Sequence, residues 1–413
     1  MAKLNLPQTL KGFRDFLPNE KRKRDFVLEK IKQTFELFGF EPLETPTLEY
    51  ADLLLGKYGK EADKLIYIFK DRGNREVGLR YDQTVPTARV LTQYKNQLPK
   101  YFRRYQFQNV YRADKPQKGR YREFTQCDID IFGTTSPLAD TEIIACTYFA
   151  FKNVGFPNVT LRINDRQILF DVIKKSGITE QKSLSVIQSL DKLDKKTVDQ
   201  VQMELKKKGV TLEQFQKINN LLKQARPTKQ LEKIIGFSIS SGVPKDRIEF
   251  IPYLARGLDY YTGMIFEVII PEFESGSLGG GGRYDKLIDQ LSGTNTPAVG
   301  IAFGFDRMVE AASEMNLIPK ATSVIKALIT IFPGYEGKSL NLANTLRTAD
   351  IKTEIFPQDE NLDKQLKYAA AKNIPFVLMI GPDEAKADKV TLKDMTTGEQ
   401  QSLTLDQVVV RLK

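Results

Sequence analysis

Two long segments of alternating residues place the strongest constraint on the fold of this chain. Residues 101–112 and 121–132 alternate polar and apolar side chains with the period of two that is typical of a β-strand. The sequence ADKPQKGR lies between them and is too long and too basic for a tight turn. The pattern therefore predicts a long antiparallel hairpin with a basic loop at its tip.

Helical patterns occupy two further regions of the chain. A first helix is expected over residues 19–38, with Asn19 as its N-cap. Residues 166–246 form successive amphipathic helical segments without strand patterns between them. This second region is predicted to be a helical insertion, after which strand patterns resume at residue 248.

The last part of the chain is expected to be a domain of its own. From Lys326 onwards the pattern alternates strand, helix, strand, helix and strand, which is typical of a compact α/β domain. The predicted organisation is a first domain over residues 1–325, which contains the helical insertion of about 166–246, and a second over 326–413. The fold class is therefore α+β.

The composition restricts both the chemistry and the partners. A formal net charge of +10 reflects either a lysine-rich solvated surface or a polyanionic partner such as nucleic acid. The chain contains no histidine, which excludes Ser-His-Asp and Cys-His catalysis and His-ligated zinc. Cys127 and Cys146 form neither a disulfide framework nor a zinc knuckle, so a reducing cytoplasm is expected.

One strand of the predicted hairpin carries an unusual polar row. The period of two places Phe124, Gln126, Asp128 and Asp130 on one face of this strand. A face that packs into a core would not carry these polar residues in sequence. The row is either a solvent-exposed face or the floor of a polar cleft, and its spacing alone favours the solvent-exposed face.

Three other features combine charge or glycine with the ends of elements. Arg112 ends the first hairpin strand at the mouth of the basic loop, where a guanidinium group can grip a phosphate. Four glycines at 279–282 form either a flexible loop or a backbone that a ligand can approach closely. Arg307 falls in the first turn of a helix, where a cation is unfavourable unless an anion neutralises it.

A further segment, residues 255–269, reads as a strand whose first half is crowded with polar groups. Arg256, Tyr260 and Tyr261 lie there within six residues. Strict alternation would put Arg256 and Tyr261 on opposite faces, so a bend is needed if they act together, and Gly257 is the expected place for it.

Taken together, these segments resemble the class II aminoacyl-tRNA synthetases in their histidyl form. The hairpin, VYRADKPQKGRYREFTQCDIDIFG, is similar to motif 2 of that class, GIAFGFDRM to motif 3, and FGFEPLETPTLEY to motif 1. LRYDQTVPTAR and LARGLDYYTGMIFEV resemble two signatures of the histidyl enzymes, and GGGGRYD belongs to the same set. The resemblance covers nearly the whole chain, and it implies an antiparallel catalytic sheet and a C-terminal anticodon-binding domain.

The resemblance also implies roles for individual residues. The residues that would bind histidine are Asp82, Gln83, Thr84, Gln126, Asp130, Tyr260 and Tyr261. In this set, Asp82, Thr84 and Gln126 would meet the ammonium group. Asp130 would accept a proton-bearing ring nitrogen, and the two tyrosines would line the pocket.

The nucleotide contacts follow from the same resemblance. Arg112 and Arg256 would reach the α-phosphate of ATP as the catalytic cations, and Arg307 would reach the γ-phosphate. Mg²⁺ on the phosphates is implied by the family, whereas the sequence contains no cluster of metal ligands that can be recognised. The basic loop at 115–120 would face the acceptor end of the tRNA.

The activity implied by the resemblance is that of a histidine–tRNA ligase. Such an enzyme activates L-histidine as histidyl-adenylate and transfers it to the 3′ end of tRNA(His), as a cytoplasmic homodimer without a membrane partner. The alternative is a catalytically silent paralogue that serves as a regulatory or sensor subunit. One departure is visible: this chain carries RYDQT where many bacterial members carry Arg-Pro-Glu-Gly-Thr, a difference that leaves its lineage open.

Overall fold

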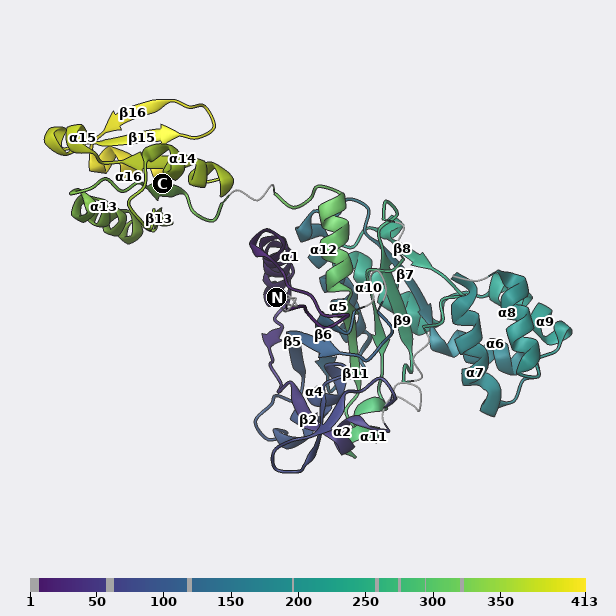
Figure 1. Cartoon of the computed structure of the whole chain (residues 1–413). Helices are drawn as coiled ribbons and strands as arrows, with labels where there is room; N and C mark the ends of the chain where they lie inside the picture. The colour runs from purple at the N-terminus through teal and green to yellow at the C-terminus, as the bar shows by residue number, and fades with distance from the viewer. Residues whose placement is uncertain are drawn as a thin grey trace. The chain divides into compact units, whose positions relative to one another are not determined.

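The chain folds into two compact units, Met1–Ile318 and Pro319–Lys413 (Figure 1). The computed structural model describes residues 7–56, 63–116, 121–194, 197–256, 260–273, 276–293, 295–319 and 323–413. Most of the predicted basic loop and Gly257 lie outside the described residues. Within them, no helix has the length and apolar character needed to cross a membrane.

An eight-stranded sheet organises the described part of the first unit, in the order β1-β5-β6-β11-β10-β9-β7-β8. Only the two outermost pairs, β1 with β5 and β7 with β8, are parallel within this sheet. In sheet order, the strands are Glu41–Pro42, Phe102–Tyr111, Glu123–Phe132, Ala298–Phe303, Gly279–Arg283, Met264–Ile269, Thr160–Asp165 and Ile248–Phe250. The predicted long hairpin is confirmed, because β5 and β6 pair in antiparallel register over their full lengths.

Helices cover one face of this sheet and enclose the main core. They are α1 (Pro18–Leu37), α5 (Pro137–Val154), α10 (Lys229–Ser240) and α12 (Phe305–Glu314). The apolar row of β6, Cys127, Ile129 and Ile131, faces this core. The polar row of the same strand consequently faces the other side of the sheet.

The start of α1 differs from the prediction. The helix begins at Pro18 and its N-cap is Leu17, so Asn19 lies inside the first turn and is not the cap. Proline suits this position, because its missing N–H is one of those that have no partner at a helix start. The helix buries an apolar stripe, since Val27, Ile31 and Phe35 are all fully buried.

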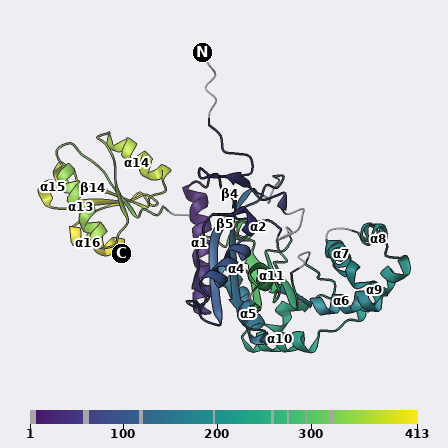
Figure 2. The same cartoon turned by 90° about the horizontal axis from the view of Figure 1, so that it is seen from below.

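Within the described residues, the region predicted as a helical insertion is a run of helices without strands. It contains α6 (Arg166–Lys175), α7 (Glu180–Leu190), α8 (Val198–Lys207) and α9 (Leu212–Gln224). Figures 1 and 2 show these four grouped at the end of the first unit away from α1. The last helix of the predicted insertion, α10, instead packs Leu231 and Ile234 into the core beside α5.

A small sheet lies beside the hairpin, in the order β2-β4-β3. Its strands are Leu48–Tyr50, Glu76–Leu79 and Ile68–Lys70, and α2 (Ala51–Leu54) and α4 (Thr84–Gln93) are adjacent to it in sequence. The extended segment from β1 to β2 connects this small sheet to the edge of the large one.

The second unit has its own sheet, in the order β13-β12-β14-β15-β16. The predicted alternation appears as β12 (Ala327–Ile329), α13 (Glu336–Thr348), β13 (Thr353–Ile355), α14 (Leu362–Ala371) and β14 (Phe376–Met379). The remaining elements are α15 (Pro382–Ala387), β15 (Val390–Asp394), β16 (Gln400–Leu403) and α16 (Leu405–Leu412). No element was predicted after residue 381, where mostly exposed β16 lacks an alternating apolar pattern.

Two sequence interpretations need correction. Only the second half of residues 255–269 is a strand, β9, and Arg256 ahead of it has the left-handed backbone angle φ 48°. Arg256 therefore departs from the extended conformation of a strand. The four glycines do not form a flexible loop, because they make up most of the fully buried strand β10.

Candidate active site

A cavity of about 280 Å³ lies on the polar side of the large sheet. The predicted site residues that line it are Asp82, Thr84, Arg112, Gln126, Asp130, Arg256, Tyr260 and Tyr261. These residues come from three separate regions of the sequence. The pairing of β6, β11, β10 and β9 brings the last two regions together, and the start of α4 supplies the first.

A second cavity, of about 290 Å³, adjoins the first at Arg112. Arg307 lines this second cavity together with Phe124 and Asp306, whereas Arg112 lines both. The Arg112 guanidinium lies 4.4 Å from the ring centroid of Tyr81 and 5.1 Å from that of Phe124. The arrangement suits an elongated ligand with a negative group at the junction.

The polar row of β6 forms the floor of the first cavity. Gln126, Asp128 and Asp130 are only 7%, 3% and 5% exposed. The expectation of a solvent-exposed face is therefore wrong, and the row is the floor of a polar cleft. The period of two gave the shared face correctly, but it carries no information on what covers that face.

Arg256 reaches the cavity by lying over the backbone of β10. A Cβ atom placed on Gly280 would be 2.0 Å from Arg256 Nη1 and 2.2 Å from Cζ. Only glycine leaves room for the guanidinium group at this point. Arg166 is almost fully buried, and its Nη1 donates a hydrogen bond to the Arg256 carbonyl oxygen at 3.4 Å. This contact supports the backbone at Arg256.

Asp130 is held from three sides. Its Oδ2 forms an ion pair with Arg104 Nη2 at 2.6 Å, and its Oδ1 accepts a hydrogen bond from the Tyr284 hydroxyl. Gly300 lies opposite Asp130 on β11, where a Cβ atom would be 1.8 Å from Oδ1. Burial raises the pKa of Asp130 above its usual value, although Arg104 opposes that rise.

Asp128 shares the same buried cation. Its Oδ2 lies 3.7 Å from Arg104 Nη2 and accepts a hydrogen bond from Gln126 Nε2 at 2.7 Å. Burial raises the pKa of Asp128 to about 7, and the charge on nearby Asp130 adds to this effect while Arg104 opposes it. The floor thus holds two carboxylates for one guanidinium group.

Gln83 lies behind the cavity and does not line it. Its side chain is fully buried, and Nε2 donates hydrogen bonds to the carbonyl oxygens of Gln126 at 2.8 Å and Gln108 at 3.2 Å. Its Oε1 accepts a hydrogen bond from Arg104 Nη1 at 3.3 Å. In this position Gln83 orients the floor of the cavity through the backbone of β5 and β6.

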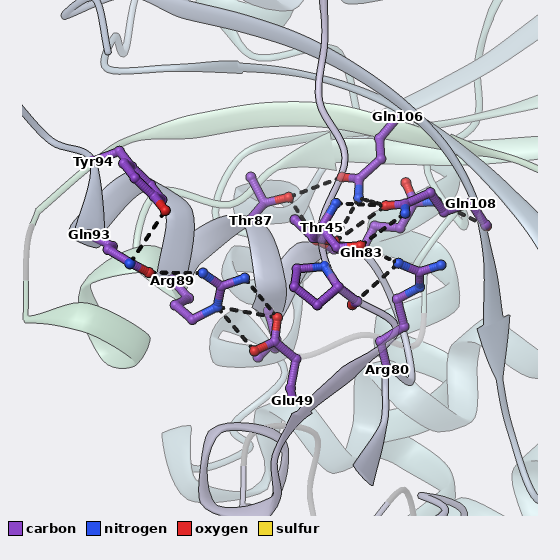
Figure 3. Close-up of polar contacts among 12 residues, drawn as sticks. Thr45, Glu49, Arg80, Gln83, Thr87, Arg89, Gln93, Tyr94, Gln106 and Gln108 are labelled. Carbon is purple, nitrogen blue, oxygen red and sulfur yellow. Dashed lines mark hydrogen bonds and ion pairs between the residues drawn. The ribbon is translucent and has the colours of Figure 1, made fainter. Parts of the chain in front are cut away.

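A buried polar network continues towards the extended segment before β2, and Figure 3 shows its members Gln106, Gln108 and Thr45. Arg104 Nη1 donates to Gln106 Oε1 at 3.0 Å, and Gln106 Nε2 donates to Thr45 Oγ1 at 2.9 Å. Gln108 Oε1 accepts a hydrogen bond from the Thr45 amide at 3.0 Å. Arg80 Nη1 donates to the Thr45 carbonyl oxygen at 2.7 Å, so the segment is fixed from both directions.

Figure 3 also shows how α4 is tied to the small sheet. Arg89 on α4 binds Glu49 on β2 through Nη2 at 2.8 Å and through Nε at 3.1 Å. Such paired contacts between a guanidinium group and a carboxylate fix orientation as well as position. They anchor the helix whose first turn carries Thr84.

Several residues of the site were not predicted from the sequence. They are Arg104, Asp128, Tyr284, Gly280 and Gly300. Asp128 stands in the polar row that was recognised, and Tyr284 stands in the GGGGRYD segment, so both had a signal. Arg104 had no such signal in the sequence. Its role depends on the pairing of β5 with β6, which places Arg104 opposite Asp130.

Comparisons with known proteins show the family of the chain. The family model for histidyl-tRNA synthetase matches residues 12–308, and that for an anticodon binding domain matches residues 327–413. Relatives named histidine–tRNA ligase are 39% identical in Gloeobacter violaceus, over 96% of both chains, and 38% identical in Cytophaga hutchinsonii, over 100% of both. The crystal structure of histidyl-tRNA synthetase from Nostoc sp. PCC 7120 has a TM-score of 0.84 at 30% identity, covering 98% of this chain and 99% of that one. The chain therefore belongs to the histidyl-tRNA synthetase family.

Proposed function

We propose that this chain activates L-histidine with ATP as histidyl-adenylate and then transfers the histidine to the 3′ end of tRNA(His). The observation that carries the proposal is the pair of cavities that meet at Arg112. One cavity is rich in carboxylates and phenols, which suit a cationic, aromatic amino acid. The other ends at Arg307, which suits a polyphosphate. The full-length relatives with this activity support the same conclusion.

The first cavity binds histidine through both of its ends. Asp82, Thr84 and Gln126 meet the ammonium group, and the amide nitrogen of Gln126 is already engaged by Asp128, which leaves its carbonyl oxygen as an acceptor. Asp82 is oriented by a hydrogen bond from the Val85 amide at 3.1 Å. Gln83 acts from behind, as a positioning residue.

The ring end of the cavity is aromatic and acidic. The rings of Tyr260 and Tyr261 lie 4.7 Å apart, and Tyr260 meets Tyr284 edge to face at 5.9 Å. These rings form a wall on which an imidazole can pack. Asp130 accepts a hydrogen bond from a proton-bearing ring nitrogen, since a carboxylate has more acceptor sites than Tyr284 and Arg104 use.

Adenylate formation needs no protein base in this site. A carboxylate oxygen of histidine attacks the α-phosphorus, and the bond to the oxygen that bridges to the β-phosphate breaks, which releases pyrophosphate. Arg112 and Arg256 stabilise the negative charge on the transferring group, and Arg307 holds the γ-phosphate. Among the described residues, no group of three acidic or cysteine side chains is placed to hold a metal ion by itself. Mg²⁺ would accompany ATP and would supply positive charge at the phosphates, beside the three arginines.

The remaining parts of the chain serve the tRNA and the dimer. The second unit holds the anticodon, and the basic loop at 115–120, largely outside the described residues, faces the acceptor end. The segment that resembles motif 1 ends in β2, and the small sheet that contains β2 supplies a dimer surface. Its exposed apolar side chains are Leu48, Tyr50, Ile68 and Phe69. The cytoplasm, where tRNA is charged, is the proposed location.

A silent regulatory paralogue is not favoured. Arg112, Arg256 and Arg307 are all present at the two cavities, and the C-terminal unit matches an anticodon binding domain. Charging of a tRNA(His) transcript with labelled histidine in the presence of ATP and Mg²⁺ tests the proposal. Accumulation of histidyl-tRNA is expected, and its absence with folded protein would reject the ligase activity.

A further inference from the structure

Asp128 lines the cavity, and none of the roles above uses its Oδ1. Its Oδ2 is engaged by Gln126, whereas its Oδ1 is buried and has no hydrogen-bond donor within the part of the chain that the structure describes. A buried acceptor that lacks a donor costs more free energy than one hydrogen bond contributes to stability. A ligand that brings an N–H group to this oxygen would remove that penalty.

We propose that Asp128 is a specificity-determining residue that accepts a hydrogen bond from one ring nitrogen of histidine while Asp130 accepts one from the other, so that the pocket selects the imidazolium form. The inference rests on the proposed function, since it concerns the same amino-acid site. It adds a second residue that contacts the imidazole ring, and it specifies that histidine binds with this ring positively charged.

The strand geometry supports this pairing. Asp128 and Asp130 are two residues apart on β6, so their side chains leave the same face about 7 Å apart. An imidazolium ring donates an N–H from each of two nearly opposite edges, whereas the neutral ring donates only one. Two carboxylates at this spacing therefore match the two N–H groups of the charged ring. With the neutral ring, one of the two carboxylates would have no N–H donor.

The local charge supports it as well. Arg104 from β5 is the cation in contact with both carboxylates, and it lies below the floor with essentially no exposed surface. Asp82, ahead of α4, adds a third carboxylate to the same cavity, and Tyr284 faces Asp130 as a hydrogen-bond donor. Arg256 also lines this cavity, with its guanidinium group over Gly280. When Asp128 and Asp130 are both ionised, they carry one negative charge more than Arg104 balances, and an imidazolium ring would balance that charge.

The chain itself makes the test clean. Because it contains no histidine, the bound substrate carries the only imidazole in the complex. Nitrogen-15 NMR of labelled histidine on the full-length wild-type protein at pH 7.5 should give two protonated ring nitrogens, although free histidine is mostly neutral there. A bound ring with one unprotonated nitrogen would overturn the proposal, whether or not any variant folds.

Kinetics of ATP–pyrophosphate exchange supply the second arm. Asp128→Asn should raise the KM for histidine by at least about tenfold, with little change in kcat, because it removes one charged hydrogen bond from the ground state and the transition state alike. It should also reduce the preference for histidine over 1,2,4-triazole-3-alanine, whose ring is a much weaker base. An unchanged KM and an unchanged preference would overturn the role of Asp128.

A matched control is available on the same strand. Glu123 lies at the far end of β6, half-exposed, and lines neither cavity. Glu123→Gln makes the same kind of charge removal and should leave the histidine KM at its wild-type value. If wild-type protein showed no histidine-dependent exchange, the proposed function itself would fail. If wild-type exchange were normal and Asp128→Asn changed neither the histidine KM nor the preference for histidine, only this inference would be rejected.

Discussion

The Arg256 guanidinium occupies the space that a side chain at Gly280 would fill. The three nearest atoms to a Cβ placed on Gly280 all belong to Arg256, at 2.0, 2.2 and 2.5 Å. The two residues are far apart in the sequence, and the β9–β10 pairing brings their segments together. The glycine strand therefore makes room for Arg256, the proposed catalytic cation, and is also a part of the sheet.

Gly280→Ala should displace Arg256 without breaking the sheet. We expect kcat for ATP–pyrophosphate exchange to fall about 100-fold, which is the usual effect of losing one preorganised charge-stabilising group. The KM for histidine should change little. Gly236→Ala is the matched control, because Gly236 is exposed in α10 and has open space around its Cβ position. A normal kcat in Gly280→Ala would show that Arg256 does not act from this position.

Arg256→Ala should also lower kcat and leave the histidine KM nearly unchanged, because the guanidinium group acts on charge that develops in the transition state. If Gly280→Ala works through Arg256, the double variant should be no slower than Arg256→Ala alone. Additive losses in the double variant would mean that Gly280 serves catalysis by another route.

Thr45→Val tests whether the network behind the cavity positions Asp130. The change removes the hydroxyl that accepts a hydrogen bond from Gln106, whose Oε1 in turn holds Arg104. We expect the free energy of unfolding to fall by about 1–3 kcal/mol. The KM for histidine should also rise over its wild-type value by a larger factor than the KM for ATP does. Thr45→Ser keeps the hydroxyl and should restore the histidine KM. Equal changes in both KM values would point to general destabilisation.

Asp128 should make the stability of the empty protein depend on pH. Its pKa is raised to about 7 in the folded chain from 3.8, mainly by burial. Its contribution to stability is therefore complete below about pH 4 and decreases as pH rises towards 7, because ionisation costs more in the folded state. Asp128→Asn should lose less unfolding free energy than wild type between pH 4 and 7, measured by denaturant titration. Parallel curves would contradict the raised pKa.

Removal of the second unit should separate activation from tRNA binding. A chain that ends at Ile318 should retain ATP–pyrophosphate exchange, because both cavities lie in the first unit. Its affinity for tRNA(His) should fall, and so should the salt dependence of binding, since fewer phosphates are contacted. Wild-type tRNA affinity in the shortened chain would refute an anticodon-binding role for residues 319–413.

Periodicity in the sequence predicted the hairpin and the helices, because those elements follow from local patterns. It could not tell that the row of Gln126, Asp128 and Asp130 is buried, since burial depends on what the rest of the chain places over that face. The N-cap of α1 was misplaced for a local reason: Pro18 is itself suited to the first helical position, so the helix starts before Asn19.

The cavity residues that resemble family motifs could be named in advance, whereas their supports could not. Arg104 meets Asp130 only through the register of β5 and β6, and Gly300 meets it through the register of β11 and β6. Such contacts join residues that are distant in sequence and share no pattern. The left-handed backbone angle of Arg256 was likewise not predicted from the sequence, because such an angle is uncommon for arginine.

ATP–pyrophosphate exchange with each of the twenty amino acids tests the central claim most directly. Asp82, Asp128 and Asp130 line the same cavity as Arg112 and Arg256, and this combination should make exchange depend on histidine. We predict that histidine supports exchange and that the other nineteen amino acids leave it near background. Exchange that is absent with histidine, or as fast with another amino acid, would contradict the account.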